Sequence, residues 1–224
     1  DVLKQQEYAW WLQRFERSFD LYDFTRLDHF IGFTSFYDVQ SGHAASEGSD
    51  VFGPGLDLFR IAFQHFGALP LIAEDLGSIT PAVRALLAET GIPGMSVAVF
   101  SNQDPREHFE ANLETIVYTS THDTPTLAGY LKRRFIYPDN EDAWCDGSFD
   151  EKPHEAFERV LKNVLTLPND VAVIPLQDIL ELDDSARMNV PGTAEGNWAW
   201  RCPSGMLTLA MAEKLRALVK HVAR

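Results

Sequence analysis

Three short apolar runs in this chain each lead into a polar segment that contains a carboxylate. The runs are Leu21, Tyr22 and Phe24 before Asp28, Leu69 to Ala73 before Glu74, and Thr115 to Ser120 before Asp123. Short apolar runs bounded in this way are typical of buried strands. In barrels of parallel strands the active site lies where the strands end. The sequence therefore predicts strands that place several carboxylates at one end of an α/β fold.

The first of these strand ends carries a charged pair. Side chains alternate along a strand, so Arg26 and Asp28 are expected to point to the same face. A guanidinium beside a carboxylate keeps the carboxylate ionised, as a nucleophilic or charge-stabilising Asp requires. A structural ion pair that closes the strand end is the alternative, and the pair alone does not decide between the two.

Apolar residues at helical spacing alternate with these strands. They predict helices at 2–20, 56–66, 81–90, 105–113, 126–135, 153–165 and 204–224, further strands at 95–100 and 171–176, and long loops at 32–55 and 183–203. Ser78 or Thr80 can cap the third helix, and Ser204 the last. Alternating strands and helices favour a parallel sheet. Only five strands are expected, whereas a (β/α)8 barrel needs eight, so this chain does not close a barrel alone.

Composition restricts the class of partner. The formal net charge of −14 argues against nucleic acid and anionic membranes, which demand basic patches, but a neutral polymer such as a glucan meets no such objection. No apolar run is long enough to span a bilayer and no signal peptide is evident, so we expect a soluble cytoplasmic protein. Cys145 and Cys202 cannot form a disulfide framework or a four-cysteine zinc site. The start at Asp1, without Met, suggests a piece of a longer protein.

Four motifs resemble, in order, those of the 4-α-glucanotransferases, the amylomaltases or disproportionating enzymes of glycoside hydrolase family 77. They are Arg26-x-Asp28-His29-Phe30; Ala73-Glu74-Asp75-Leu76-Gly77; Tyr118-Thr119-x-Thr121-His122-Asp123; and Met188-Asn189-x-Pro191-Gly192-Thr193 with Gly196-Asn197-Trp198-x-Trp200-Arg201. The resemblance implies an α/β fold that is the C-terminal part, about five β/α units, of a (β/α)8 TIM barrel. Residues 1–224 would be a single partial catalytic domain without the N-terminal strands, which a missing segment would complete.

The resemblance also implies a retaining transfer of α-1,4-glucan segments to an acceptor sugar, with no cofactor and no metal. Asp28 would be the nucleophile, Glu74 the general acid and base, and Asp123 the stabiliser of the charged sugar. A retaining pair needs its two carboxyl groups about 5 to 5.5 Å apart, which neighbouring strand ends can provide. Contacts with the substrate are implied for Arg26, His29, His122, Asn189, Asn197 and Trp198.

Other interpretations remain open. A hydrolase of α-glucans differs from a transferase only in how well it excludes water. An inactive glucan-binding fragment is the alternative outside enzymes, since an incomplete barrel exposes apolar edges. A metal site at Asp28, His29, His122 and Asp123 has suitable residue types but no local ligand spacing. The chain departs from the family pattern at Ile31, where many members have Arg, and between Phe36 and Gly53, which has no Trp.

Overall fold

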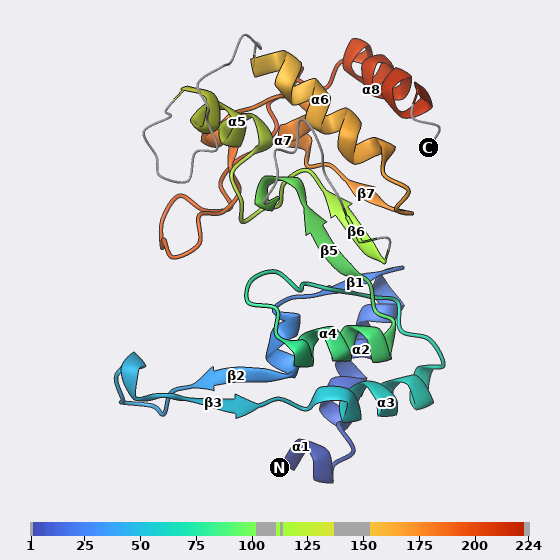
Figure 1. Ribbon diagram of the computed structural model, residues 1–224, viewed down its shortest axis with the longest axis vertical. Coiled ribbons are helices and arrows are strands. Elements are labelled where there is room, and N and C mark those ends of the chain that lie inside the picture. Colours follow the sequence, from blue (N-terminus) through green and yellow to red (C-terminus); the bar gives the residue numbers. More distant parts are fainter. Residues whose placement is uncertain (1, 102–110, 113, 137–152, 222–224) are drawn as a thin grey trace. The chain divides into compact units, whose positions relative to one another are not determined.

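The computed structural model describes residues 2–101, 111–112, 114–136 and 153–221 (Figure 1). The chain divides into two compact units, Asp1–Met95 and Ser96–Arg224. Each unit is described by itself below. No helix in the described ranges combines the length and the apolar character that a membrane crossing requires.

The first unit surrounds a pair of parallel strands. Its elements in chain order are α1 (Val2–Gln5), α2 (Ala9–Leu21), β1 (Thr25–Leu27), η1 (Phe30–Phe33), β2 (Ser35–Asp38), η2 (Ala45–Glu47), β3 (Ser49–Phe52), α3 (Gly55–Phe66), β4 (Leu71–Ala73) and α4 (Pro81–Thr90); β5 (Gly94–Val97) begins here. Strands β1 and β4 pair in parallel, with Thr25 opposite Leu71 and Leu27 opposite Ala73. Both strands therefore end at the same edge.

Aromatic side chains from α2, η1 and α3 form the core beside these strands. Phe15, Phe30 and Phe59 are almost fully buried. The rings of Phe30 and Phe59 lie 5.5 Å apart between centroids, and Phe33 lies 5.2 Å from Phe59. Ring pairs at these distances stabilise a core beyond the area that they bury. This cluster fixes the segment that follows β1.

Three expectations for this unit are corrected. The first helix is broken at Glu7 and Tyr8, which adopt positive φ, so α1 and α2 are separate. The approach to Asp28 is not a buried strand, because Leu21 ends α2, and Tyr22 and Phe24 are exposed. The segment 32–55 is not one long loop but contains the antiparallel hairpin of β2 and β3. Its turn lacks the Asn-Gly or Asp-Gly signal that would have identified a hairpin.

The helix after Glu74 agrees with its predicted boundaries. Thr80 is the N-cap, and its Oγ1 accepts a hydrogen bond from the backbone N–H of Val83 at 3.4 Å. Pro81 occupies the first turn, and Gly91 ends the helix at φ 65°, a conformation that glycine adopts without a steric penalty. Helix α3 ends at Phe66, as predicted, and Gly67 is its C-cap.

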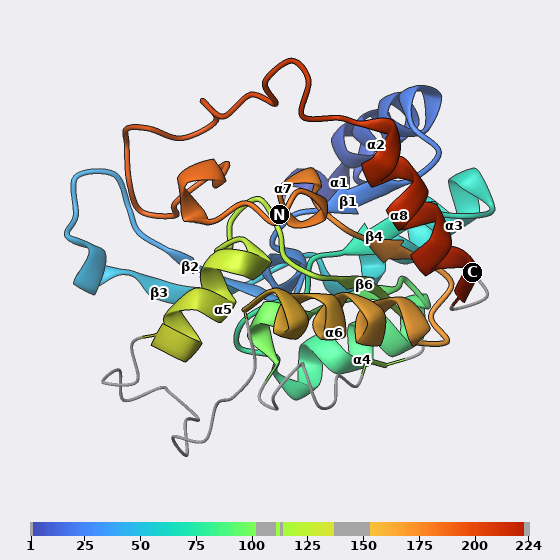
Figure 2. The same cartoon turned by 90° about the horizontal axis from the view of Figure 1, so that it is seen from above.

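The second unit contains a three-stranded sheet in the order β5-β6-β7. Its elements are η3 (Ala98–Phe100), β6 (Thr115–Tyr118), α5 (Leu127–Ile136), α6 (Pro153–Thr166), β7 (Ala172–Val173), α7 (Leu176–Ile179), η4 (Asp184–Ala186) and α8 (Leu209–His221). Strands β6 and β7 are parallel. Helices α5 and α6 contact each other (Figure 2). Val117, Leu127, Leu131, Val160 and Val164 are buried in the core of this unit.

Several predicted boundaries in this unit shift. The last strand is only Ala172–Val173, because Pro175 is followed at once by α7. The terminal helix begins at Leu209, after Thr208, whose Oγ1 accepts a hydrogen bond from the Met211 N–H at 3.2 Å, so Ser204 is not its cap. The predicted helix at 105–113 lies outside the described residues except for 111 and 112, which are not helical.

Candidate active site

Asp28 and Glu74 directly follow β1 and β4, and backbone hydrogen bonds join the two segments in which they lie. The Glu74 N–H donates to the Leu27 carbonyl at 2.9 Å, and the Phe30 N–H donates to the Glu74 carbonyl at 2.9 Å. Backbone pairing thus extends beyond the two strands. Asp28 lies between Leu27 and Phe30, the two residues that bond to the Glu74 backbone. The sequence prediction that these carboxylates follow neighbouring strand ends is confirmed.

Asp28 forms the predicted ion pair with Arg26. Arg26 Nη1 donates to Asp28 Oδ1 at 2.7 Å. The Asp28 side chain is 77% exposed, so its carboxylate is free to meet a ligand, whereas the Arg26 side chain is mostly buried. Arg26 Nε also points at Met95 Sδ, 3.4 Å away, so β5 helps to hold the guanidinium beside Asp28.

Both carboxylate oxygens of Glu74 accept hydrogen bonds from backbone N–H groups. Oε2 accepts from His29 at 2.7 Å, and Oε1 accepts from Leu76 at 3.1 Å. His29 adopts φ 50°, a left-handed conformation that is uncommon outside glycine. This backbone conformation directs the His29 N–H toward Glu74. The residue next to Asp28 therefore fixes the orientation of the second carboxylate.

Asp75 supports the same edge, although we did not identify it from the sequence as a site residue. Its Oδ1 accepts a hydrogen bond from the Met95 N–H at 2.7 Å. Burial raises the pKa of the Asp75 carboxyl above its ordinary value, and the hydrogen bond from Met95 partly opposes the change. A Cβ at Gly94 would lie 2.4 Å from Asp75 Oδ2, so the close approach requires glycine. In the sequence, the position of Asp75 directly after Glu74 could have indicated that Asp75 belongs to the site.

In the second unit, the predicted residues after β6 and in the 183–203 segment meet each other. Asn189 Nδ2 donates to Asp123 Oδ1 at 2.6 Å, and His122 Nε2 lies 3.2 Å from Asp123 Oδ2. The Asn189 N–H also donates to the His122 carbonyl at 3.0 Å. The rings of His122 and Trp198 are 5.4 Å apart between centroids, and Trp198 is 55% exposed. These four residues form one cluster around Asp123.

Asn197 shapes the loop instead of joining this cluster directly. Its Oδ1 accepts a hydrogen bond from the Val190 N–H at 2.9 Å, and its Nδ2 donates to the Thr193 carbonyl at 2.9 Å. Arg201 donates to the carbonyls of Trp198 and Trp200. These bonds fix the turn that presents Trp198, which itself adopts φ 60°.

The sequence analysis missed Arg187, which also contacts the Asp123 segment. Its Nη2 donates to the Asp123 carbonyl at 3.0 Å. Arg187 lies two residues before Asn189 in the sequence, and this spacing could have indicated that both residues contact the same segment. Among the residues that the structure describes, no three His, Cys, Asp or Glu side chains form a group suited to a metal ion.

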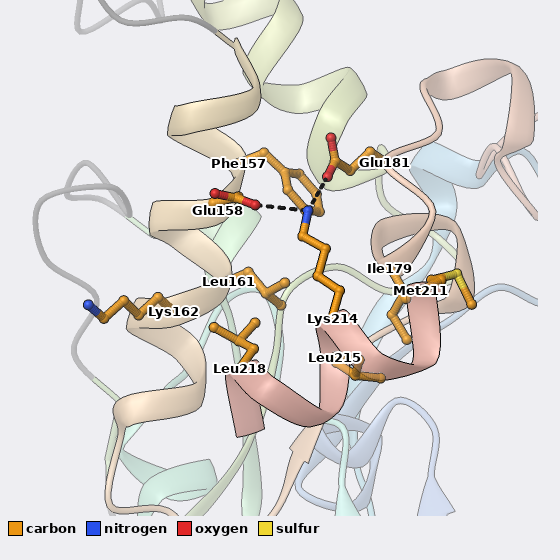
Figure 3. Close-up of a pocket in the computed structure, with 10 residues that line it drawn as sticks. All are labelled: Phe157, Glu158, Leu161, Lys162, Ile179, Glu181, Met211, Lys214, Leu215 and Leu218. Atoms are coloured by element: carbon orange, nitrogen blue, oxygen red, sulfur yellow. Dashed lines mark hydrogen bonds and ion pairs between the residues drawn. The ribbon is translucent and has the colours of Figure 1, made fainter. Parts of the chain in front are cut away.

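A separate hollow of about 300 Å³ lies between α6, α7 and α8 (Figure 3). Its walls are mostly apolar, with Leu161, Ile179 and Leu218 among them. Lys214 crosses it and pairs with Glu158 at 2.8 Å and Glu181 at 3.4 Å. Lys214 thus engages both carboxylates of the hollow, and the rest of its lining is mostly apolar, unlike the polar clusters that follow β1, β4 and β6.

The chain matches a family model described as 4-alpha-glucanotransferase over residues 1–208. It is 35% identical to the 4-alpha-glucanotransferase of Streptococcus pneumoniae over 221 residues, which are 96% of this chain and 43% of the relative. It is 35% identical to that of Thermus thermophilus over 238 residues, covering 100% of this chain and 47% of the relative. The chain thus spans less than half the length of these relatives.

Solved structures of amylomaltases are similar to this chain in fold. The amylomaltase of Streptococcus agalactiae in complex with acarbose superimposes with a TM-score of 0.85 at 28% identity, over 99% of this chain and 46% of that one. The amylomaltase of Corynebacterium glutamicum gives a TM-score of 0.72 at 21% identity, over 99% and 38% of the two chains, and supports the fold alone. The predicted fold class, a part of a (β/α)8 barrel, is confirmed.

Proposed function

Because the chain belongs to the 4-alpha-glucanotransferase family, glycoside hydrolase family 77, we propose that it carries the catalytic carboxylates of an enzyme that transfers α-1,4-glucan segments to an acceptor sugar. The observation that carries the proposal is the parallel pairing of β1 with β4, which places Asp28 and Glu74 on adjacent strand ends. A retaining mechanism requires two carboxyl groups on neighbouring positions of this kind. We propose residues 1–224 as one partial catalytic domain.

Asp28 is the proposed nucleophile. Its carboxylate oxygen attacks the anomeric carbon of the donor glucan, and the bond from that carbon to the glycosidic oxygen breaks. The exposed carboxylate of Asp28 suits this role, because an attacking oxygen must reach the sugar. Arg26 compensates the negative charge and orients the carboxylate through the bond at 2.7 Å. The product of this step is a glycosyl ester on Asp28.

Glu74 is the proposed general acid and base. It gives its proton to the departing glycosidic oxygen, and it then removes a proton from the acceptor hydroxyl that displaces Asp28. The N–H groups of His29 and Leu76 hold the carboxyl group in place, so it does not need to reorient between the two steps.

Asp123 is the proposed stabiliser of the positively charged sugar. Asn189 and His122 each contact a different oxygen of its carboxylate, which leaves further lone pairs for sugar hydroxyls. The exposed ring of Trp198 beside His122 offers an apolar face to a pyranose. We assign Arg26, His29, His122, Asn189, Asn197 and Trp198 to contacts with the substrate. Asn197 also shapes the loop that carries Asn189 and Trp198.

The proposed substrate is a maltooligosaccharide or a longer α-1,4-glucan. One structural relative is described in complex with acarbose, and the chain's charge of −14 favours a neutral ligand over an anionic one. A hydrolase of α-glucans is the second candidate within the same chemistry, with water in place of the acceptor sugar. The relatives include bacterial proteins and a chloroplastic/amyloplastic one from Arabidopsis thaliana, so a cytoplasmic location stays a prediction.

We propose that a further segment completes the barrel against β1. Within the described residues β1 is paired with β4 alone, and Tyr22 and Phe24 beside it are 61% and 67% exposed. An unpaired strand edge with exposed aromatic residues is a site for association with another segment. Without such a segment, the chain is an inactive glucan-binding fragment, which is the alternative function.

Separation of the products formed from maltotriose tests the proposal. The assay contains this chain and, to complete the barrel, the part of the Streptococcus pneumoniae relative outside the 43% that this chain matches. Longer maltodextrins together with glucose are the expected result, and Asp28→Asn in the same mixture should form neither. Glucose and maltose without longer products would instead identify a hydrolase. A fully active Asp28→Asn would refute the role of Asp28.

A further inference from the structure

One buried carboxylate, Asp178 in α7, holds both ends of the segment that carries His122 and Asp123. Asp178 Oδ2 accepts hydrogen bonds from Thr119 Oγ1 and Ser120 Oγ, each at 2.6 Å. Its Oδ1 accepts a hydrogen bond from the Leu127 N–H at 2.8 Å. The segment 121–126 begins directly after the first two donors and ends directly before the third. Its two ends are therefore fixed relative to each other through a single side chain.

The cost of burying this carboxylate argues that it has a specific task. Asp178 is 0% exposed, and a buried charge is expensive unless hydrogen bonds compensate it. Well-packed apolar residues often stabilise a core as well as, or better than, buried charges do. Three donors from three residues at the segment's ends offset part of this cost, while burial still raises the pKa of the Asp178 carboxyl above its ordinary value. An apolar side chain at the same position would leave those three donors without an acceptor.

Gln177 and the loop after α7 provide further contacts that fix the same segment. Gln177 Nε2 donates to the Ala186 carbonyl at 3.2 Å, which joins α7 to the end of η4. The next residue, Arg187, donates to the Asp123 carbonyl, and Asn189 donates to the Asp123 carboxylate. Contacts from the loop after α7 thus converge on the backbone and on the side chain of Asp123, and Gln177 in α7 ties the start of that loop to the helix.

We propose that Asp178 is a positioning residue for Asp123 and His122, acting by fixing the segment 121–126 and making no contact with substrate itself. The proposal rests on the function proposed above for Asp123. Asp123 must present its carboxylate to the sugar within a narrow range of positions, since displacement by about 1 Å can cost on the order of 100-fold in rate. Asp178 removes the freedom of the segment to make that displacement.

Two substitutions separate geometry from charge. Asp178→Asn keeps a carbonyl oxygen for the Leu127 N–H, and its amide can donate to the two hydroxyls, which can rotate to accept. Asp178→Ala removes all three bonds. A structural control is Val160→Ala in α6, which creates a cavity in the core of the same unit but removes none of the three hydrogen bonds to Asp178. Loss of stability alone would affect Asp178→Ala and Val160→Ala in the same way.

Amide hydrogen exchange of the purified chain provides the first test and requires no activity. In Asp178→Ala, exchange should rise at 119–127 by more than elsewhere in the unit, while Val160→Ala should show no such local increase. Asp178→Asn should stay closer to the wild type than Asp178→Ala. Equal exchange at 119–127 in Asp178→Ala and the wild type would overturn the proposal.

The second test is a double-mutant cycle. It measures the turnover of maltotriose by this chain together with the added segment that completes the barrel. Asp178→Ala should lower kcat by roughly 100-fold with a smaller change in KM, and Asp178→Asn should recover much of the loss. When Asp123 is already replaced by Asn, Asp178→Ala should lower kcat by a much smaller factor, because the effect of Asp178 is transmitted through Asp123. Full additivity of the two substitutions would overturn the proposal. Full activity of Asp123→Asn alone would instead refute the function proposed for Asp123, whereas the exchange result judges Asp178 separately.

Discussion

At the scale of single residues, the proposed role of Glu74 can be tested by comparing a substrate whose leaving group needs a proton with one whose leaving group does not. Glu74→Gln keeps the size of the side chain and a carbonyl oxygen for one of its two N–H donors, but its amide is not acidic enough to transfer a proton to the leaving oxygen. Activity of the completed barrel on maltotriose should fall about 100- to 10,000-fold. Activity on α-maltosyl fluoride should fall much less, because fluoride leaves without a proton.

Rates on the two substrates are compared for Glu74→Gln and the wild type under identical conditions. Asp20→Asn, an exposed carboxylate in the same unit, serves as the control for loss of one charge. Full activity of Glu74→Gln on maltotriose would rule out its role as the acid. Equal losses on both substrates would point to a disturbed site and not to a missing proton.

Asp75 should make the stability of the chain depend on pH. Burial raises its pKa above the ordinary 3.8, so the folded state binds more protons than the unfolded state just above pH 3.8. The contribution of Asp75 therefore favours folding at low pH and is lost as pH rises through the folded-state pKa. Asp75→Asn keeps an acceptor for the Met95 N–H but does not titrate.

Urea unfolding from pH 3.5 upward measures this effect. The free energy of unfolding of Asp75→Asn, minus that of the wild type, should increase with pH above 3.8 and then become constant. Asp23→Asn, an exposed carboxylate in the same unit, provides a comparison with the same change in formal charge. A difference for Asp75→Asn that does not change with pH would contradict the assignment.

The sequence revealed these residue-level contacts unevenly, for a physical reason. Alternation along a strand places Arg26 and Asp28 on one face, and a local pattern is enough to predict their ion pair. The bonds from Asp178 to Thr119 and Ser120 join positions nearly 60 residues apart. No local pattern encodes the burial of Asp178, because its hydrogen-bond partners lie far from it in the sequence.

At the scale of elements, the start of α4 allows a direct test of capping. Both Ser78 and Thr80 could cap this helix from the sequence, and the structure selects Thr80 through its bond to Val83. Thr80→Ala should lower the free energy of unfolding by about 1 kcal/mol. Ser78→Ala, which removes a hydroxyl two residues earlier, should have a clearly smaller effect. Urea unfolding of both variants measures the difference, and equal effects would show that the cap does not depend on Thr80.

Elements with strong local signals were predicted well, and those determined by long-range packing were not. Helices α3, α4 and α6 combine apolar periodicity with clear boundaries, and their predicted limits agree with the structure within one residue. The hairpin of β2 and β3 was missed because its polar residues lack both alternation and a strong turn signal. Helix α8 was placed too early, since Ser204 precedes residues that continue as an irregular segment up to Thr208.

At the scale of the whole molecule, the edge of β1 is the feature that most needs a partner. The edge of a strand presents unpaired N–H and carbonyl groups, and Tyr22 and Phe24 add exposed aromatic surface beside it. The chain spans less than half the length of these relatives, and the segment proposed above to complete the barrel would cover this surface. Covering it would supply both hydrogen bonds and apolar burial to the same strand that leads into Asp28.

Addition of the part of the Streptococcus pneumoniae relative outside the 43% that this chain matches should therefore stabilise the chain. A partner at 100 times its Kd stabilises the folded state by about 2.7 kcal/mol, which calorimetry detects as a higher Tm.

Phe24→Ser should weaken this association but leave the isolated chain nearly unchanged, because Phe24 is exposed there. Phe52→Ser is the matched control, since Phe52 is 91% exposed on β3 and has no place at the β1 edge. Equal weakening by the two variants would show that the partner does not bind along β1, and an unchanged Tm with wild-type chain would show that no such association forms.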